Sequence, residues 1–299
     1  MRKALTALVV TAAALAGLSG VAAGSGATSV HGVVASASSG TGLAGVCLRL
    51  ISSSGSNPAG APIRTSASGR FQFSHLAPGT YDVITCLNAS SPYAQASVTA
   101  VAAGSGAGGT VTLNLVAGGR ISGTVTSEGA RPAPGLEVVA EPTTGTMELS
   151  EIFMPTRTGA SGRYTITNLA PGRYSVAIGD EVGPRDHWGY AAAHTAPVTV
   201  TAGRVTPAPR LAVIALGGIV GTVVSSQTGQ PLADACLQAK GPAMAYPATT
   251  LPSGRFTFTG LLPGRWTIAP CGAAPGSPHS GAIVVRPDRG TAAGQVRLP

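Results

Sequence analysis

Charged and aromatic residues are scarce in this chain of 299 residues, at 10% and 4% of the sequence. The 19 basic residues outnumber the 11 acidic ones, for a formal net charge of +8 at pH 7. The basic residues are spread along the chain without a cluster that interleaves with aromatics, so we predict no nucleic-acid partner. The net charge favours only a general, non-specific attraction to anionic polymers.

Motifs of common catalytic centres are also missing, because no H-E-x-x-H, G-x-S-x-G or P-loop pattern occurs. A glycosidase needs two carboxylates held in a cleft. Asp82 is the one acid of residues 28–117, and Asp234 and Asp288 are the two of residues 217–299. Residues 118–216 hold the other eight acids, but no larger catalytic scaffold accompanies them. We therefore predict that the protein is not an enzyme and has no cofactor. An α-amylase-type glycoside hydrolase accessory protein is a distant alternative.

The chain also lacks an apolar run long enough to cross a membrane after its first 27 residues. The longest candidate, Leu211–Val224, has 14 residues, whereas a typical span needs about 20. Residues 1–27 have the pattern of a signal peptide: a basic start, an apolar stretch, and small residues before a cleavage site at Ala23 or Ala27. We predict a secreted, extracellular protein with no membrane span in the mature chain.

One phrase, by contrast, occurs three times. It reads SGRFQFSHLAPGTYDV at Ser68–Val83, SGRYTITNLAPGRYSV at Ser161–Val176 and SGRFTFTGLLPGRWTI at Ser253–Ile268. Repeats more than 90 residues apart are long enough to bury cores of their own. We predict a signal peptide at 1–27 and three tandem domains at 28–117, 118–216 and 217–299.

The repeated phrase alternates like a β-strand. Phe71 and Phe73, two residues apart, point to the same face of a strand, and the later aromatic Tyr81 belongs to a second strand. Between them, the pair Pro78-Gly79 and its counterparts suit a type II turn, so the phrase reads as a β-hairpin. Short strands, frequent turns and no sustained helical periodicity predict an all-β fold of three Ig-like or prealbumin-like β-sandwiches.

The four cysteines follow the repeat. Cys47 and Cys236 occupy one position of the first and third copies, and Cys86 and Cys271 occupy another. The second copy lacks both together. This joint presence and absence predicts the disulfides Cys47–Cys86 and Cys236–Cys271. A metal site made from all four is disfavoured, because no C-x-x-C pair occurs.

The least repetitive segment, residues 180–194, follows the last strand of the phrase in the second copy. An aromatic residue on such a loop suits stacking on a sugar ring, with neighbouring charges binding hydroxyls. The alternative is that Trp188 packs onto the edge of its domain or the next one. A metal site from Asp186, His187 and His194 is a weaker alternative, and we predict no metal. Ligand contact is predicted for five residues: Arg185, Asp186, His187, Trp188 and Tyr190.

The triplicated pattern, an opening x-G-x-V strand followed by SGRFxFxxLxPGxYxV, resembles the carboxypeptidase regulatory-like domain. This resemblance implies a prealbumin-like sandwich of the carbohydrate-binding-like fold, in which domains are usually accessory to other activities. We therefore expect a secreted binding module for a polysaccharide or cell-envelope glycan. The alternative is a structural spacer or adhesin that binds another surface protein.

Overall fold

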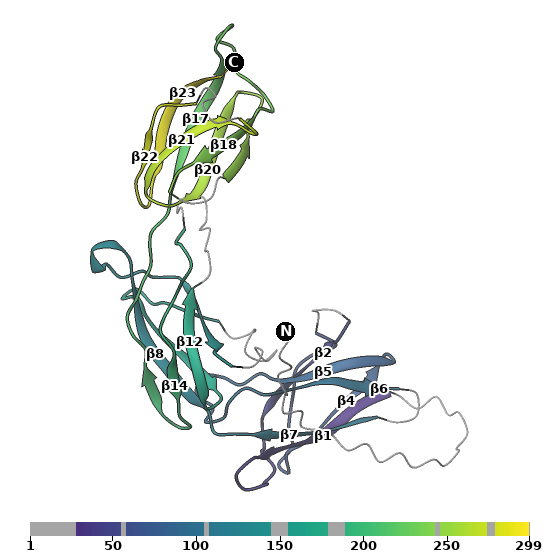
Figure 1. Cartoon of the computed structure of the whole chain (residues 1–299). Coiled ribbons are helices and arrows are strands. Elements are labelled where there is room, and N and C mark those ends of the chain that lie inside the picture. Colours follow the sequence, from purple (N-terminus) through teal and green to yellow (C-terminus); the bar gives the residue numbers. More distant parts are fainter. Residues whose placement is uncertain are drawn as a thin grey trace, which may run out of the picture.

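The computed structural model describes residues 28–54, 58–104, 108–144, 155–178, 189–242, 246–273 and 279–298, and folds them into three β-sandwich domains in chain order (Figure 1). The predicted signal peptide lies outside the described residues. Within them, no helix is long and apolar enough to cross a membrane. The all-β fold predicted from the repeat is confirmed.

The three domains are built from equivalent strands. The first contains β1 (Thr28–Ser36), β2 (Cys47–Ser52), β3 (Ile63–Arg64), β4 (Arg70–Leu76), β5 (Gly79–Thr85), β6 (Ser97–Ala103) and β7 (Gly109–Leu115). The second contains β8 (Gly119–Thr126), a 3-10 turn at Glu128–Ala130, β9 (Glu137–Pro142), β10 (Thr156–Arg157), β11 (Arg163–Leu169), β12 (Gly172–Ile178), β13 (Ala193–His194), β14 (Val198–Val200), β15 (Val205–Pro207) and β16 (Leu211–Ala212). The third contains β17 (Gly217–Ser225), β18 (Cys236–Lys240), β19 (Tyr246–Thr249), β20 (Arg255–Leu261), β21 (Gly264–Pro270), β22 (Ile283–Val285) and β23 (Gly290–Leu298).

Two sheets enclose the core of each domain. In the first domain they have the strand orders β4-β1-β7 and β3-β2-β5-β6, and the third repeats this arrangement as β20-β17-β23 and β19-β18-β21-β22. Apolar residues of both sheets form one cluster per domain, within residues 30–115, 121–213 and 219–298. Each cluster lies inside one predicted domain range, while the exact boundaries between the domains stay a prediction.

The first and last strands of every domain run side by side in the same direction. β1 is parallel to β7, β17 is parallel to β23, and β8 is parallel to both β15 and β16. Because parallel neighbours point the same way, the chain enters each domain at one end of the sandwich and leaves it at the other. Successive domains are therefore joined end to end.

The hairpin prediction for the repeated phrase is wrong. β4 pairs with β1, whereas β5 pairs with β2 and β6, so the phrase crosses from one sheet to the other. The type II turn is also wrong: Gly79 and Gly172 do not have a positive φ, and Gly264, at 149°, is far from the value of about 80° that this turn needs. The left-handed conformation common to all three copies falls earlier, at the bulge residues His75 (59°), Asn168 (60°) and Gly260 (70°). Local alternation identifies the strands but not their partners, and both strands bury aromatics in the shared core.

A hydrogen bond holds this crossover in every copy. The Tyr81 hydroxyl donates to the Ala77 carbonyl oxygen at 2.7 Å, four residues back. Tyr174 repeats the bond to Ala170 at 3.0 Å, and the Trp266 indole nitrogen donates to Leu262 at 2.9 Å. The aromatic ring is thus buried while its polar atom is satisfied, as a core Tyr or Trp requires.

Candidate interaction sites and domain junctions

The predicted ligand loop is only partly placed. Arg185, Asp186, His187 and Trp188 lie outside the described residues, so their role stays a prediction. Tyr190 is half-buried and packs against the core of the second domain. Burial raises the pKa of Tyr190, and the negative charge of Asp288 in the third domain raises it further. Tyr190 also forms a β-bridge with Ala215, two residues before β17 begins, and so lies at the junction between the second and third domains.

The metal alternative involves His194, which lies exposed on β13, paired with Ala177 of β12. Asp186 and His187 of that alternative are outside the described part of the chain. Among the residues that the structure describes, no group of three His, Cys, Asp or Glu side chains is arranged to hold a metal ion.

The junction between the first and second domains is built around Asn168. This residue is 3% exposed, and its side-chain amide donates to the carbonyl oxygens of Tyr93 at 2.8 Å and Ser91 at 3.3 Å. Its own carbonyl oxygen accepts from the Gln95 backbone N–H at 2.8 Å. The Thr167 hydroxyl donates to the Asn168 side-chain oxygen at 2.8 Å, which orients the amide. A loop of the first domain is thus bound to the bulge of the second.

Backbone contacts extend this junction into the linker. The Gly118 N–H donates to the Pro92 carbonyl at 2.8 Å, and Ala117 forms a β-bridge with Tyr93. A Cβ at Gly118 would lie 2.7 Å from the Tyr93 carbonyl carbon, closer than any side chain tolerates. The Arg120 guanidinium donates to the Ala89 carbonyl at 3.0 Å. These contacts fix the linker against the loop.

The second junction lacks the Asn168 contact. Its bulge residue is Gly260, where a Cβ would meet nothing within 4 Å among the described atoms. As at the first junction, the linker is bound to the loop of the preceding domain: Ala215 forms a β-bridge with Tyr190, and the Leu216 N–H donates to the Gly189 carbonyl at 2.9 Å. A turn of the third domain also holds it, because the Asp288 N–H donates to the Leu216 carbonyl at 2.8 Å. The two junctions therefore share the linker bridge and differ in the Asn168 contact.

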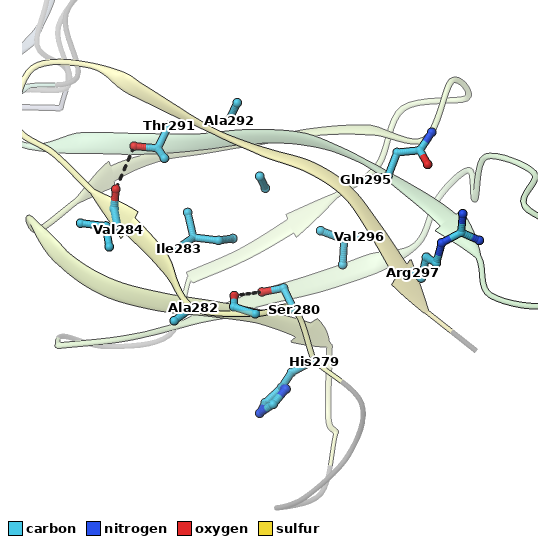
Figure 2. A pocket seen from close by; sticks show the side chains of 12 residues that line it. His279, Ser280, Ala282, Ile283, Val284, Thr291, Ala292, Gln295, Val296 and Arg297 are labelled. Carbon is cyan, nitrogen blue, oxygen red and sulfur yellow. Dashed lines mark hydrogen bonds between the residues drawn. The ribbon is translucent and has the colours of Figure 1, made fainter.

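A groove opens at the edge of the third domain, between β22 of one sheet and β23 of the other (Figure 2). Its volume is about 570 Å³. The Thr291 hydroxyl donates across it to the Val284 carbonyl at 3.2 Å, and the Ser280 hydroxyl donates to Gly281 at 2.9 Å. His279 and Arg297 are the lining residues that can carry charge, and none of the lining residues is an acid. This groove has no acid–base pair for hydrolysis.

Two further grooves lie at equivalent places on the first and second domains, over the sheets that contain β1 and β8. The groove of the first domain has a volume of about 650 Å³ and includes Arg64 and Arg70. That of the second, of about 400 Å³, includes Arg163 and Arg210. Neither set of lining residues contains an acid. These grooves were not predicted from the sequence. Arg70 and Arg163, the arginines of S-G-R in the first two copies, line them.

The two predicted disulfides are confirmed. Cys47 and Cys86 are bonded with their Cα atoms 5.0 Å apart, and Cys236 and Cys271 with theirs 5.4 Å apart. Both bridges join the two central strands of the larger sheet or the residue that follows them.

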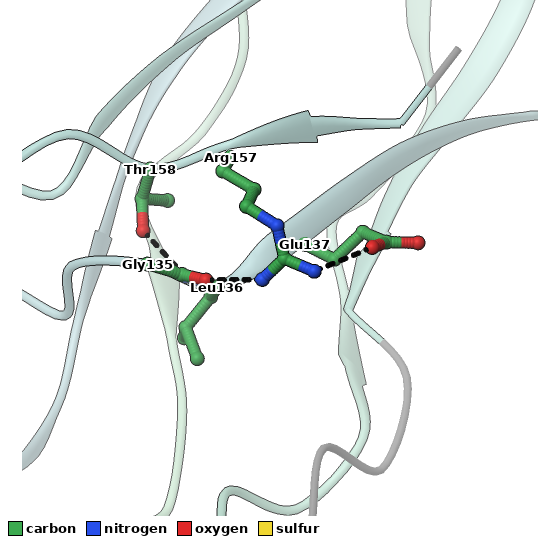
Figure 3. Close-up of polar contacts among 5 residues, drawn as sticks. All are labelled: Gly135, Leu136, Glu137, Arg157 and Thr158. Atoms are coloured by element: carbon green, nitrogen blue, oxygen red, sulfur yellow. Dashed lines mark hydrogen bonds and ion pairs between the residues drawn. The ribbon is translucent and has the colours of Figure 1, made fainter. Parts of the chain in front are cut away.

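The second domain has a different contact at the corresponding place. Glu137 stands at the position of Cys47, and its carboxylate is paired with the Arg157 guanidinium of β10 at 3.0 Å (Figure 3). Arg157 also donates to the Gly135 carbonyl at 2.7 Å. The Arg157 and Glu137 side chains are 61% and 38% exposed, so the pair contributes at most about 1 kcal/mol.

Comparisons with known proteins agree with this architecture. Residues 120–213 match the carboxypeptidase regulatory-like domain, and residues 28–101 match the second β-sandwich domain of BOS complex subunit NOMO1-like proteins. The chain thus contains a β-sandwich of the carboxypeptidase regulatory-like type, as the repeated phrase predicts. No curated protein matches the sequence.

Several solved structures resemble the chain weakly. The Bacillus anthracis TIE protein is 14% identical with a TM-score of 0.29, over 91% of this chain and 50% of that one. This chain therefore covers only half the length of the TIE protein. The Streptococcal ancillary pilin is 13% identical with a TM-score of 0.33, over 87% and 95% of the two chains. GBS52, the minor pilin of Streptococcus agalactiae, is 13% identical with a TM-score of 0.29, over 62% and 95%. At these scores the likeness carries no argument about function.

Proposed function

We propose that this protein is a secreted, non-enzymatic spacer that holds a binding surface away from its point of attachment. The observation that carries the proposal is the parallel pairing of first and last strands, as in β1 and β7. It makes each domain a segment that the chain crosses from end to end. Short linkers and the hydrogen bonds around Asn168 limit the freedom between the first two segments.

An extracellular location accounts for two further features. Disulfides persist in oxidising compartments, and the first and third domains each contain one. The N-terminal 27 residues supply the expected export signal. The lack of an acid in each of the three grooves described above supports a binding role over hydrolysis.

The partner of the spacer is a surface protein or a polysaccharide. The polysaccharide prediction rests on the loop with Arg185, Asp186, His187 and Trp188. Tyr190, at one end of that loop, lies at the junction between the second and third domains. This position favours a structural role for that end of the loop. A protein partner therefore has the stronger support.

Small-angle X-ray scattering of the mature chain from residue 28 tests the spacer. We expect a scattering profile that fits the extended outline of Figure 1, in which the first domain is set at an angle to the other two, and little change with salt. A compact particle with the domains folded back on one another would overturn the proposal.

Retention on starch, cellulose, chitin or purified cell wall, with reducing-sugar release followed in the same tubes, tests the partner. Retention without sugar release would support a polysaccharide as the partner. Sugar release would contradict the proposal that the protein is not an enzyme.

A further inference from the structure

The last strand of the second domain is interrupted, unlike that of the first. Its ladder with β8 stops at Pro207, opposite Ser122, and resumes only at Leu211, opposite Val125. Pro209 has no N–H to donate, which prevents a regular ladder there. In the first domain the equivalent pairing of β1 with β7 runs without a break from Val30 to Ser36. The third domain has a bulge at this place but stays paired.

The same domain carries a buried hydroxyl that its neighbours lack. Tyr164 replaces the Phe71 and Phe256 of the other copies and is 4% exposed. Its hydroxyl has no hydrogen-bond partner among the described residues. The hydroxyl lies against Gly123, the β8 residue that follows the end of the ladder, since a Cβ at Gly123 would collide with it. Buried polar groups are normally paired, so this one calls for a partner.

A groove on the solvent face of the same sheet, opposite the core face that holds the Tyr164 ring, supplies positive charge and hydroxyls. Arg163 of β11 and Arg210, from the stretch without a ladder, line it together with the hydroxyl-bearing residues Ser122, Thr124 and Thr165. Guanidinium groups are suited to the oxygens of carboxylate, sulfate and phosphate. The lining contains no acid that would repel an anion.

We propose that the groove of the second domain is a binding site for an oxyanion, a phosphate, sulfate or carboxylate group of a larger polymer. Arg163 and Arg210 neutralise the bound group, and the Tyr164 hydroxyl donates a hydrogen bond to one of its oxygens. The Tyr164 ring lies on the core face of β11, whereas Arg163 lies on its solvent face. A bound group therefore reaches the buried hydroxyl only through the break in the β8 ladder, when Pro209 and Arg210, which are not paired with β8, move aside. The site does not depend on the spacer function.

The first domain provides a natural comparison. Its groove also holds two arginines, Arg64 and Arg70, but Phe71 offers no hydroxyl and the β1–β7 ladder is closed. If charge alone attracted anions, the two grooves would bind alike. If the proposal is correct, the second domain binds more tightly.

NMR titration of the full mature chain with sodium phosphate, sodium sulfate and sodium acetate, each at an ionic strength held constant with chloride, tests the site. We expect saturable shifts of residues around Gly123 with at least one of the three anions, which also identifies the preferred group. Arg163→Gln and Arg210→Gln should each weaken binding about tenfold or more, the loss expected for one charge-assisted contact. Arg70→Gln, the matched change in the first domain, should leave the affinity unchanged.

Tyr164→Phe separates the site from general charge effects, because it keeps the net charge and gives the residue found in the other two copies. We expect a folded protein whose anion affinity is about tenfold lower. NMR shifts that do not saturate would overturn the proposal, and so would an equal loss of anion affinity in Arg163→Gln and Arg70→Gln. Either result would mean that the anions act only by general screening of charge. An unchanged anion affinity in Tyr164→Phe would show that the hydroxyl does not contact the bound anion. Retention on dextran sulfate but not on dextran would extend the site to polymers.

Discussion

The side-chain amide of Asn168 in the second domain donates a hydrogen bond of 2.8 Å to the backbone carbonyl of Tyr93 in the first. Asn168 occupies the bulge position of the repeat, where the backbone takes a positive φ that Asn tolerates better than most residues. In the first copy the same position holds His75, which is exposed. One repeat position therefore serves as a bulge in every domain and as a connector in one.

Replacing Asn168 with Gly should loosen the first junction. Gly keeps the positive φ but removes both amide hydrogen bonds to the first domain. We expect a loss of about 1–3 kcal/mol in the coupling of the two domains, at about 0.5–1.5 kcal/mol for each bond. The distribution of distances between spin labels on the two domains should broaden. His75→Gly is the matched change at an exposed position of the first domain and should leave the distribution as it is. Equal broadening in both variants would contradict the role of Asn168.

Reduction should affect the first and third domains and spare the second. The bridges close loops of 39 and 35 residues, for which chain-entropy estimates give about 4 kcal/mol each. Hydrogen exchange measured with and without dithiothreitol should show faster exchange in strands such as β2 and β18, and unchanged exchange in β9. Faster exchange of β9 to the same extent would mean that the three domains unfold as one unit.

The pair Glu137–Arg157 should not replace a disulfide. The Arg157 side chain is mostly in solvent and that of Glu137 is partly exposed, and an ion pair at such a site contributes about 0–1 kcal/mol. We expect Glu137→Gln to lower the free energy of unfolding by less than about 1 kcal/mol in urea denaturation, with a smaller difference at high salt. A larger loss that persists in 1 M salt would show that Glu137 has a role beyond this ion pair.

Much of the fold was predictable because the repeat supplies three versions of each feature. Phe71 and Phe73 recur as aromatic or apolar residues at strand spacing, and the cysteines occur or are lost as pairs. Partner choice was not predictable: β4 and β5 are adjacent in sequence, but each pairs within a different sheet. Which strand pairs with which depends on burial across the whole domain, which no local pattern contains.

The candidate sites were harder to predict than the fold. Arg163, Ser122 and Arg210 are far apart in sequence and meet only because β8 lies between β11 and the final strands. The substitution of Tyr164 for Phe was visible in the aligned phrase. The role of the Tyr164 hydroxyl could be inferred only once the ladder between β8 and the last strand was seen to stop after Pro207. In the sequence, Pro207 and Pro209 were the signal of that interruption.

Tyr164 should make the second domain sensitive to alkaline pH. Burial raises its pKa from 10.0 to about 12, because the charged phenolate is poorly solvated in the core. In the unfolded chain the hydroxyl loses its proton near pH 10, so between about pH 10 and 12 the folded state binds more protons than the unfolded one. The ionisation of this group therefore leaves stability independent of pH below about pH 10 and lowers it by about 2–3 kcal/mol as the pH rises to 12. Tyr164→Phe should remove this part of the loss of stability when urea denaturation is followed between about pH 10 and 12.

Tyr164→Phe should also raise stability at pH 7 by about 1–3 kcal/mol, because no unpaired hydroxyl remains buried. Parallel pH profiles for the two proteins would contradict the shift, and lower stability of the variant at pH 7 would mean that the hydroxyl is already paired in the free protein.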